Sequence, residues 1–243
     1  IVDKNRNILG MGHSLPAAPS WTTTCSESDK VMGLSLNLIK DWEAEELHHH
    51  RGDYCFLTAG FSHGGGQSAP SNCTQGNNQL REAVERALLD NPNIQNAGGF
   101  GDAGLATTAP SMYQYYYTTM RKLKDRCNHL KFPYKKSLYA CTTFNFGPQA
   151  VTFAHTDYMN LANGFCSILA LGNYDYKKGG HLVLHSLKLI IKFPPNTTFT
   201  VMSACCVHSN TAIAPHEYRR SIMQYSAGGL FRWVENNFRR SKK

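Results

Sequence analysis

Long apolar segments are missing from this 243-residue sequence: no run of about eighteen hydrophobic residues occurs, which excludes a membrane-spanning helix. Cysteine pairs of the C-x-x-C type are missing as well. The eight cysteines are scattered and two of them, Cys205 and Cys206, are adjacent, so neither a zinc ribbon nor a disulfide framework is indicated. Several cysteines fall in apolar segments, where a free thiol behaves as a small hydrophobic side chain. We therefore expect a reducing intracellular compartment.

Acidic residues are scarce relative to basic ones. The sequence has 17 Asp and Glu against 25 Lys and Arg, and its net charge of +8 and pI of about 9.1 favour a polyanionic partner. Basic residues gather in two stretches, namely Arg121, Lys122, Lys124, Arg126, Lys131, Lys135 and Lys136, and then Arg239, Arg240, Lys242 and Lys243. Nucleic-acid binding and a solvated helix face explain the first stretch equally well. For the second stretch, a solvated chain end is preferred over a phosphate contact.

The composition that remains is typical of a globular protein, with 42% hydrophobic and 17% charged residues. Residues 1–25 show little pattern and predict a loosely structured lead-in. A helix over 28–47 is predicted from apolar residues at helical spacing, namely Val31, Leu34, Leu38 and Trp42. A second helix is predicted over 78–90, where Asn78 can cap the start and Asn91-Pro92 ends it.

A third helix is predicted to begin at Pro110. Its apolar and aromatic residues fall on one side, namely Tyr113, Tyr116, Tyr117, Met120, Leu123 and Cys127. Before it, Gly99-x-Gly101-x-x-Gly104 matches the dinucleotide-binding fingerprint. Because that motif lacks a preceding strand and a βαβ unit here, we reject it as a nucleotide site.

From residue 137 onward the pattern changes to short apolar segments separated by turn residues. Besides a strand over 54–61, we expect strands near 137–145, 150–156, 165–172, 180–186, 188–193, 198–208 and 221–227. Strands that follow helices in this way predict an α+β fold with a double-stranded β-helix (jelly-roll) core buttressed by N-terminal helices. We assign residues 1–50 to the lead-in and first helix, and residues 51–243 to a single globular domain.

Two histidines and an aspartate form the strongest candidate site. His155 and Asp157 lie two residues apart at the end of an apolar run, and on a strand such residues face the same side. His208 ends a second strand-like run, which the mouth of a jelly roll can bring close to the first. Two imidazoles and one carboxylate on one face of a metal ion form the facial triad of non-haem Fe(II) oxygenases. The alternative is that both histidines are hydrogen-bonded core or surface residues.

An R-x-S motif, Arg219 and Ser221, opens the next strand-like run. A guanidinium fork beside a hydroxyl suits the distal carboxylate of a 2-oxo acid, which Arg can bind in a bidentate manner. A plain surface charge is the alternative interpretation of Arg219.

The segment S-H-G-G-G-Q at 62–67 is rich in glycine, which permits close approach of the backbone to a ligand or phosphate beside His63 and Gln67. A flexible turn explains it equally well. Upstream, His48-His49-His50 is interpreted as incidental, because adjacent residues cannot all face one ion. Arg51-Gly-Asp53 is a common tripeptide and receives no role.

Several motifs together resemble the TET/JBP-like Fe(II)/2-oxoglutarate-dependent DNA dioxygenases, in particular those of fungi (basidiomycetes). The resemblance spans about residues 50 to 238 and rests on S-H-G-G-G-Q at 62–67, F-N-F-G-P at 144–148, H-T-D at 155–157, G-G-H-L-V-L at 179–184, F-P-P at 193–195, H-S-N-T-A-I-A-P-H-E at 208–217, R-x-S at 219–221 and Q-Y-S-A-G-G-L-F-R-W-V at 224–234. The family favours glycine at two positions where this chain has Asn196 and His216. Asparagine tolerates the left-handed backbone angles that glycine adopts.

The resemblance implies Fe(II), 2-oxoglutarate and O2 as cofactors, with iron bound by His155, Asp157 and His208 and the 2-oxoglutarate carboxylate bound by Arg219 and Ser221. It also implies a substrate pocket lined by Asn145, Asn160, His63 and Gln67. The expected substrate is a methylated base, 5-methylcytosine or N6-methyladenine, flipped out of duplex DNA in the nucleus or elsewhere inside the cell. Alternatives are the same chemistry on a small molecule or protein, a non-catalytic transposon-associated DNA-binding module, or a cupin-like protein. The oligomeric state is left open.

Overall fold

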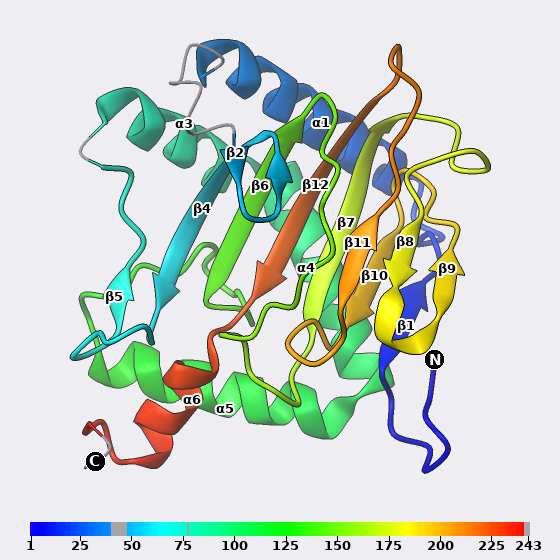
Figure 1. Ribbon diagram of the computed structural model, residues 1–243. Helices are drawn as coiled ribbons and strands as arrows, with labels where there is room; N and C mark the ends of the chain where they lie inside the picture. Colours follow the sequence, from blue (N-terminus) through cyan, green and yellow to red (C-terminus); the bar gives the residue numbers. More distant parts are fainter. Residues whose placement is uncertain (40–47, 77, 241–243) are drawn as a thin grey trace.

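A computed structural model describes residues 1–39, 48–76 and 78–240 of the chain. Its centre is a seven-stranded antiparallel sheet with the order β1-β10-β7-β12-β6-β4-β5 (Figure 1). The strands are β1 (Gly10–His13), β4 (Cys55–Ser62), β5 (Ser71–Asn72), β6 (Cys141–Gly147), β7 (Cys166–Asn173), β10 (Thr198–Val201) and β12 (Tyr218–Tyr225). A three-stranded sheet of β11 (His208–Asn210), β8 (Leu182–Leu184) and β9 (Leu189–Ile191) and a hairpin of β2 (His48–His49) and β3 (Gly52–Asp53) complete the β-structure of the described residues.

Helices cover one face of the large sheet, here called the back face. Helices α1 (Ser20–Ile39) and α4 (Pro92–Thr108) lie behind the strands, α3 (Gln79–Leu89) flanks them, and α5 (Pro110–Arg126) crosses one end beside α6 (Gly228–Glu235) (Figure 1). The three-stranded sheet lies on the opposite, front face. No helix in the described ranges is long and apolar enough to cross a membrane.

Alternation along β7 shows how the two faces are separated. Leu169 and Leu171 pack on the back with residues of α1 and α3, whereas Cys166, Ile168 and Ala170 pack on the front with residues of β8 and β10. Successive side chains of a strand point to opposite faces, so one buried strand serves two cores. Two antiparallel sheets around a shared core, with helices outside, confirm the predicted α+β jelly-roll fold.

The N-terminal region is more regular than its composition predicts. Residues 1–25 include β1, which pairs with β10 at the edge of the large sheet, and the start of α1, so a loosely structured lead-in is wrong. The predicted helix exists but begins at Ser20, and its predicted apolar stripe is not the buried one. Leu34 and Leu38 are 58% and 56% exposed. Trp42 lies outside the described residues.

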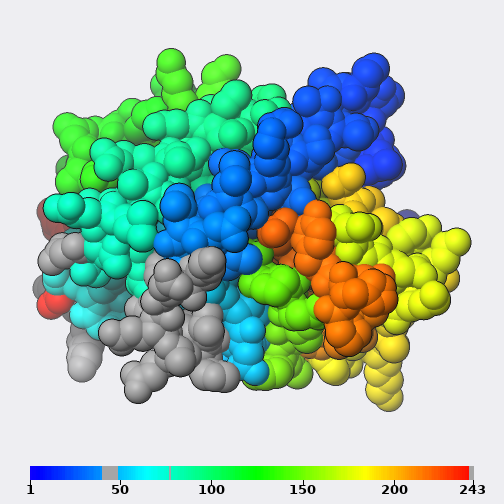
Figure 2. Space-filling view, turned by 90° about the horizontal axis from the view of Figure 1, so that it is seen from above, coloured from blue at the N-terminus to red at the C-terminus, as the bar shows by residue number. Residues whose placement is uncertain are grey.

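The buried stripe of α1 combines large apolar residues with small polar ones, namely Trp21, Thr24, Cys25, Ser28, Met32, Ser35 and Ile39. These positions follow the three- and four-residue spacing of a helix face. Small hydroxyl side chains let the helix approach the sheet closely, and a search for apolar periodicity alone misses them. The start of β12 packs against α1, as the orange and blue surfaces in Figure 2 show, and Tyr218 donates a hydrogen bond to Asp29 Oδ2 at 2.9 Å.

Helix α4 was not predicted, and it contains the rejected G-x-G-x-x-G motif. Asn91 caps it by accepting hydrogen bonds from the N–H groups of Asn93 and Ile94. A Cβ on Gly98 would lie 2.8 Å from the Tyr134 ring, and a Cβ on Gly104 would lie 2.6 Å from the His13 ring. Gly98, Gly101 and Gly104 therefore lie on the face by which α4 packs closely on its neighbours, which explains two of the three glycines of the motif, whereas a Cβ on Gly99 would meet nothing within 4 Å.

The other two predicted helices are confirmed. Asn78 caps α3 as expected, with Val84 and Leu88 buried beneath it. Helix α5 begins at Pro110 and buries Tyr116 and Leu123, although Tyr117 from the predicted stripe is 46% exposed.

Two predicted strands are wrong. Residues 150–156 form only isolated bridges and lie as an extended segment between the two sheets. Residues 198–208 do not form one strand, because β10 ends at Val201 and a turn carries the chain across to β11 in the other sheet. Asn196 has a φ of 66°, the left-handed conformation expected for this substitute for glycine.

Candidate metal centre and adjoining cavities

The candidate ligands meet through a bridge between two segments rather than along one strand. His155 and His208 exchange backbone hydrogen bonds of 3.0 and 2.9 Å, and the N–H of Asp157 donates to the carbonyl of Ser203 at 3.0 Å. The expectation that His155 and Asp157 share a face of one strand is therefore wrong, although their side chains do converge. Asp157 Oδ1 lies 3.7 Å from His155 Nε2, and Asp157 Oδ2 lies 3.9 Å from His208 Nε2.

Both imidazoles are held in the tautomer that a metal ligand requires. His155 Nδ1 lies 2.7 Å from the carbonyl of Phe153, and His208 Nδ1 lies 2.9 Å from the carbonyl of Cys206. A carbonyl oxygen only accepts hydrogen bonds, so each Nδ1 carries the proton and each Nε2 presents a lone pair toward Asp157. Burial lowers the pKa of His155, which keeps this imidazole neutral.

The donor set fits a divalent transition metal ion. One ligand atom from each of the three residues lies within 4.8 Å of the others, and Asp157 is 3% exposed. Neither carboxylate oxygen of Asp157 accepts a well-directed hydrogen bond within the described part of the chain, and the guanidinium of Arg51 lies 2.8 Å from Oδ1. A buried carboxylate oxygen without a donor is costly, so Oδ2, 3.9 Å from His208 Nε2, is the oxygen that a metal ion would complete. Two imidazole nitrogens and one carboxylate on a single side match the facial geometry of non-haem iron sites.

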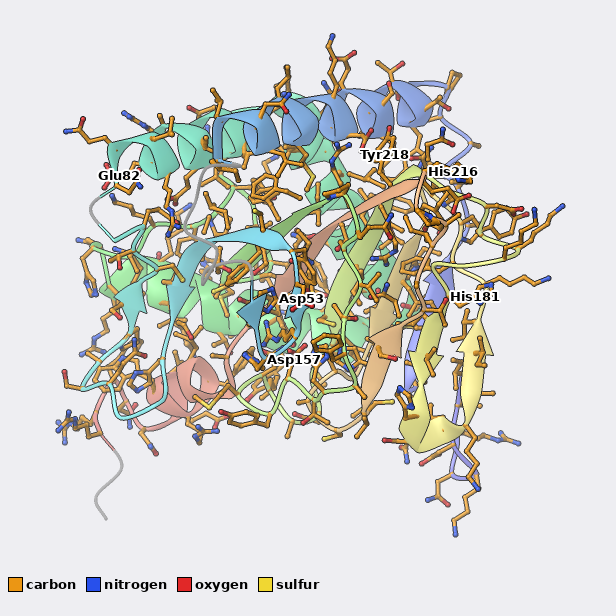
Figure 3. The ribbon with its side chains drawn as sticks, turned by 45° about the horizontal axis from the view of Figure 1, so that its top comes forward. Asp53, Glu82, Asp157, His181, His216 and Tyr218 are labelled. Atoms are coloured by element: carbon orange, nitrogen blue, oxygen red, sulfur yellow. The ribbon has the colours of Figure 1, made fainter. Side chains whose placement is uncertain are left out.

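Arg51, from the tripeptide that was given no role, lies against this carboxylate. Its Nη2 is 2.8 Å from Asp157 Oδ1, and its side chain is largely buried. The tripeptide itself carries no signal for this contact, because it depends on the hairpin of β2 and β3 lying in front of the large sheet. Figure 3 shows Asp157 next to that hairpin, which also carries Asp53.

Arg219 and Ser221 lie two residues apart on β12 and face the front of the sheet. Arg219 is 4% exposed, and its Nη1 donates to the carbonyl of Ala150 at 3.0 Å while Nε has no partner among the described residues. Ser221 pairs with Asn145 on β6, and Asn145 Nδ2 donates to Ser221 Oγ at 2.9 Å. Asn145 therefore lies beside the R-x-S motif.

One cavity of about 110 Å³ connects the two groups of residues. His155 and His208 line it together with Arg219, Ser221 and Asn145. The rest of the wall mixes apolar side chains, such as Ile168, Leu182, Phe193 and Met223, with polar ones that include His49, His50 and Arg51 of the β2–β3 hairpin. We call it the inner cavity. Two guanidinium groups and several imidazoles around one small space suit a small dianion that also reaches the metal ligands.

A second, more open cavity of about 490 Å³ lies on the other side of Asp157, and we call it the outer cleft. Asn160 and Gln67, two of the residues predicted to contact substrate, line it together with Arg51 and residues of the 62–67 loop. Beside Asp157, Tyr158 is 78% exposed and Met159 is 41% exposed. Large apolar side chains are thus presented to solvent at the entrance to the metal ligands.

The predicted substrate contacts differ in how free their polar groups are. Gln67 uses both ends of its amide within its own loop, accepting from the N–H of Gly64 at 2.9 Å and donating to Ser71 Oγ at 2.8 Å. Asn160 donates to Ser203 Oγ at 3.2 Å. His63 packs its ring against Trp233 and faces away from the outer cleft, into a neighbouring hollow. His216 lies near the start of β12, far from Asp157 (Figure 3).

Searches of protein-family models and of curated proteins give no match. Among solved structures, the chain is similar to NgTET1 in complex with 5mC DNA, with a TM-score of 0.63 and 13% identity over 93% of this chain and 75% of that one. An oxidoreductase of the 2OG-Fe(II) oxygenase family from Burkholderia pseudomallei aligns with a TM-score of 0.40 and 12% identity over 88% and 93% of the two chains. Only the first likeness is strong enough to show a shared fold. A fungal origin stays a prediction.

Proposed function

We propose that the chain is an Fe(II)- and 2-oxoglutarate-dependent dioxygenase that oxidises the methyl group of methylated bases in DNA. The observation that carries the proposal is the inner cavity, which His155, His208, Arg219 and Ser221 all line. A facial set of metal ligands joined by one small cavity to a buried guanidinium is the arrangement that a metal-chelating 2-oxo acid needs.

Each residue of the inner cavity has a distinct role in this proposal. His155, Asp157 and His208 hold iron, and Arg219 binds the distal carboxylate of 2-oxoglutarate. Because Ser221 Oγ already accepts a hydrogen bond from Asn145, its own O–H is free to donate to the same carboxylate. Ile168, Leu182, Phe193 and Met223 form the apolar part of the wall and would contact the carbon chain of 2-oxoglutarate. Bound iron supplies the redox chemistry by which O2 converts 2-oxoglutarate to succinate and carbon dioxide and hydroxylates a C–H bond of the substrate.

The outer cleft supports a nucleobase as the second substrate. It opens beside Asp157, and the exposed ring of Tyr158 offers a flat surface on which a base can stack. A base in duplex DNA must leave the stack to enter, at a cost of a few kcal/mol, which phosphate contacts from a chain of net charge +8 help to offset. The likeness in fold to NgTET1, solved with 5mC DNA, supports the same choice.

Two methylated bases fit the proposed chemistry and give different products. Oxidation of 5-methylcytosine gives a stable hydroxymethyl group that can be oxidised further. Oxidation of N6-methyladenine gives a hemiaminal, which breaks its C–N bond to leave adenine and formaldehyde. A DNA substrate also agrees with a nuclear location, which is part of this proposal.

The test is incubation of the chain with Fe(II), 2-oxoglutarate, O2 and duplexes that carry 5-methylcytosine, N6-methyladenine or no methyl group. We expect succinate release, and mass spectrometry of the nucleosides should show loss of one methylated base. If succinate forms but neither methylated base changes, the cofactor assignment holds and the DNA substrate is wrong. If no succinate forms either, the enzyme assignment is wrong.

Asp157→Ala should abolish turnover, because it removes the only anionic metal ligand of the triad. Succinate release measures this loss. The matched control is Asp125→Ala, which removes an exposed carboxylate from α5 and should leave turnover unchanged. An active Asp157→Ala variant would rule this residue out as a ligand.

A further inference from the structure

A hollow of about 510 Å³ next to the outer cleft has an unusual concentration of positive charge. Three arginines line it, Arg232 on α6 and Arg239 and Arg240 beyond its end, and among the described residues in its wall none is acidic. We call it the arginine hollow. The acidic residue of the same helix, Glu235, instead accepts a hydrogen bond from Tyr115 at 2.6 Å. The described wall of the hollow therefore carries a positive charge that no carboxylate in it balances.

The chain end is attached to the glycine-rich loop. Arg240 Nε donates to the carbonyl of Ser68 at 3.3 Å, so Arg240 does not extend freely into solvent as preferred from the sequence. His63 lines the hollow together with Arg232 and Arg240, and burial and these two positive charges lower the pKa of its imidazole. The loop and the arginines thus form one structural unit.

The 62–67 loop separates the arginine hollow from the outer cleft. Gly64 and Gln67 line both cavities, so the two cavities are separated only by the backbone of this loop. A Cβ on Gly229 would overlap the carbonyl of His63, so glycine at this position lets the loop pack directly on α6. Gly65 and Gly66 have positive φ angles, and a Cβ on either would meet open space. A ligand can therefore approach the loop backbone from the side of the hollow.

We propose that the arginine hollow binds a backbone phosphate of the DNA strand whose flipped base occupies the outer cleft. This inference rests on the proposed function and adds the phosphate contact that fixes the strand. Guanidinium groups bind phosphate oxygens in pairs through parallel N–H donors, and the loop leaves room for phosphate to reach main-chain N–H groups. Because the contact is made to phosphate alone, it positions the strand without reading its sequence.

The test uses the triple variant Arg232→Ala/Arg239→Ala/Arg240→Ala and a control with the same loss of charge, Lys4→Ala/Lys177→Ala/Lys192→Ala, whose lysines are exposed away from both cavities. Binding of a fluorescent methylated duplex to the full chain is measured by anisotropy over a range of salt concentrations. The arginine variant should bind about tenfold more weakly, and the slope of log affinity against log salt should fall by about one. The control should bind like the wild type. Arg239→Glu alone, at an exposed position, provides a second variant that keeps the fold and should weaken binding in the same direction.

Two results would overturn the inference. Equal affinity and salt slope for the wild type and both arginine variants would overturn it while leaving the proposed function intact, provided that the wild type oxidises the duplex. An equal loss of affinity in the lysine control would also overturn it, because binding would then depend on net charge and not on the hollow. If the wild type neither binds nor oxidises methylated DNA, the proposed function fails and this inference fails with it.

Discussion

Arg219 and Arg220 are neighbours on β12, yet their side chains are used in opposite ways. Arg220 points to the back face, where its Nη1 lies 2.8 Å from Asp29 Oδ1, its Nε donates to the carbonyl of Phe146 at 3.0 Å, and its guanidinium lies over the ring of Tyr218. Arg219 points to the front face and is more deeply buried, but no carboxylate pairs with it within the described ranges. A buried charge without a counter-ion costs free energy. Arg220 on the back face therefore stabilises the fold, whereas the guanidinium of Arg219 on the front face has donors that suit an anion.

The largest expected effect separates the two arginines. Arg219→Ala should raise the KM for 2-oxoglutarate by roughly 100-fold, because it removes two charge-assisted hydrogen bonds to one carboxylate. Arg220→Ala should leave this KM unchanged and lower the free energy of unfolding by about 2 kcal/mol, discounted for the partial exposure of its ion pair. Steady-state kinetics and urea titration measure the two effects. A change in KM of similar size in both variants would contradict the comparison.

Close packing on the back face predicts the next effect. A Cβ on Gly101 would lie 2.4 Å from Ser167 Oγ on β7, whereas one on Gly99 of the same helix would meet nothing within 4 Å. Gly101→Ala should therefore destabilise the protein by about 1–3 kcal/mol through overpacking. Gly99→Ala should stabilise it by up to about 1 kcal/mol, because alanine favours the helix. Urea titration of both variants tests this, and equal stabilities would show that α4 can shift away from the sheet.

A smaller effect is expected for Arg51 on the front face. Its guanidinium lies beside the carboxylate of Asp157 and orients it toward the two imidazoles. Loss of such a partner lowers metal affinity by about tenfold or somewhat more. Arg51→Ala should show this in a Mn(II) titration followed by calorimetry, with Lys192→Ala as the control. Tighter metal binding in the variant would instead mean that the guanidinium competes with the ion.

The smallest effect concerns His13, the last residue of β1, whose ring packs against α4 on the back face. Burial lowers its pKa below the ordinary value of 6.5, so the unfolded chain binds the proton more readily than the folded one. The contribution of His13 to the free energy of unfolding should therefore fall as the pH drops below about 6.5, whereas that of Asp102, whose pKa burial raises to about 7, should rise. The His13→Gln variant should lack this fall, and urea titrations at several pH values measure it. Only part of the pH dependence should disappear, since burial also lowers the pKa of His49, His63 and His155. An identical pH dependence in the variant would exclude this role for His13.

The sequence predictions were correct where the signal is local and failed where it depends on residues far apart in the chain. Caps and proline starts placed α3 and α5 correctly, because those signals lie within a few residues of the helix ends. The buried faces of α1 and α4 depend on small polar and glycine residues that match another surface, which no local pattern reveals. The start of α4 does carry local signals, the cap Asn91 and Pro92, but these were interpreted only as the end of the preceding helix.

The candidate site, too, could be predicted from local residue types but not in its tertiary arrangement. The residue types at 155, 157 and 208 were enough to choose three candidate ligands that the structure brings together, since their chemistry does not depend on the element that carries them. The bridge that brings the ligands together and the contact from Arg51 depend on tertiary structure. Sequence reasoning therefore found the chemistry of the centre but not the way the chain assembles it.

The reciprocal hydrogen bonds between the main chains of His155 and His208 have a consequence for how the ion comes and goes. Because the two ligand-bearing segments are tied to each other by backbone groups, the coordination site is already assembled when the polypeptide folds. A chelator should thus remove the ion without unfolding the protein, and the stripped form should reload by simple ligand exchange, accepting whichever divalent cation is supplied.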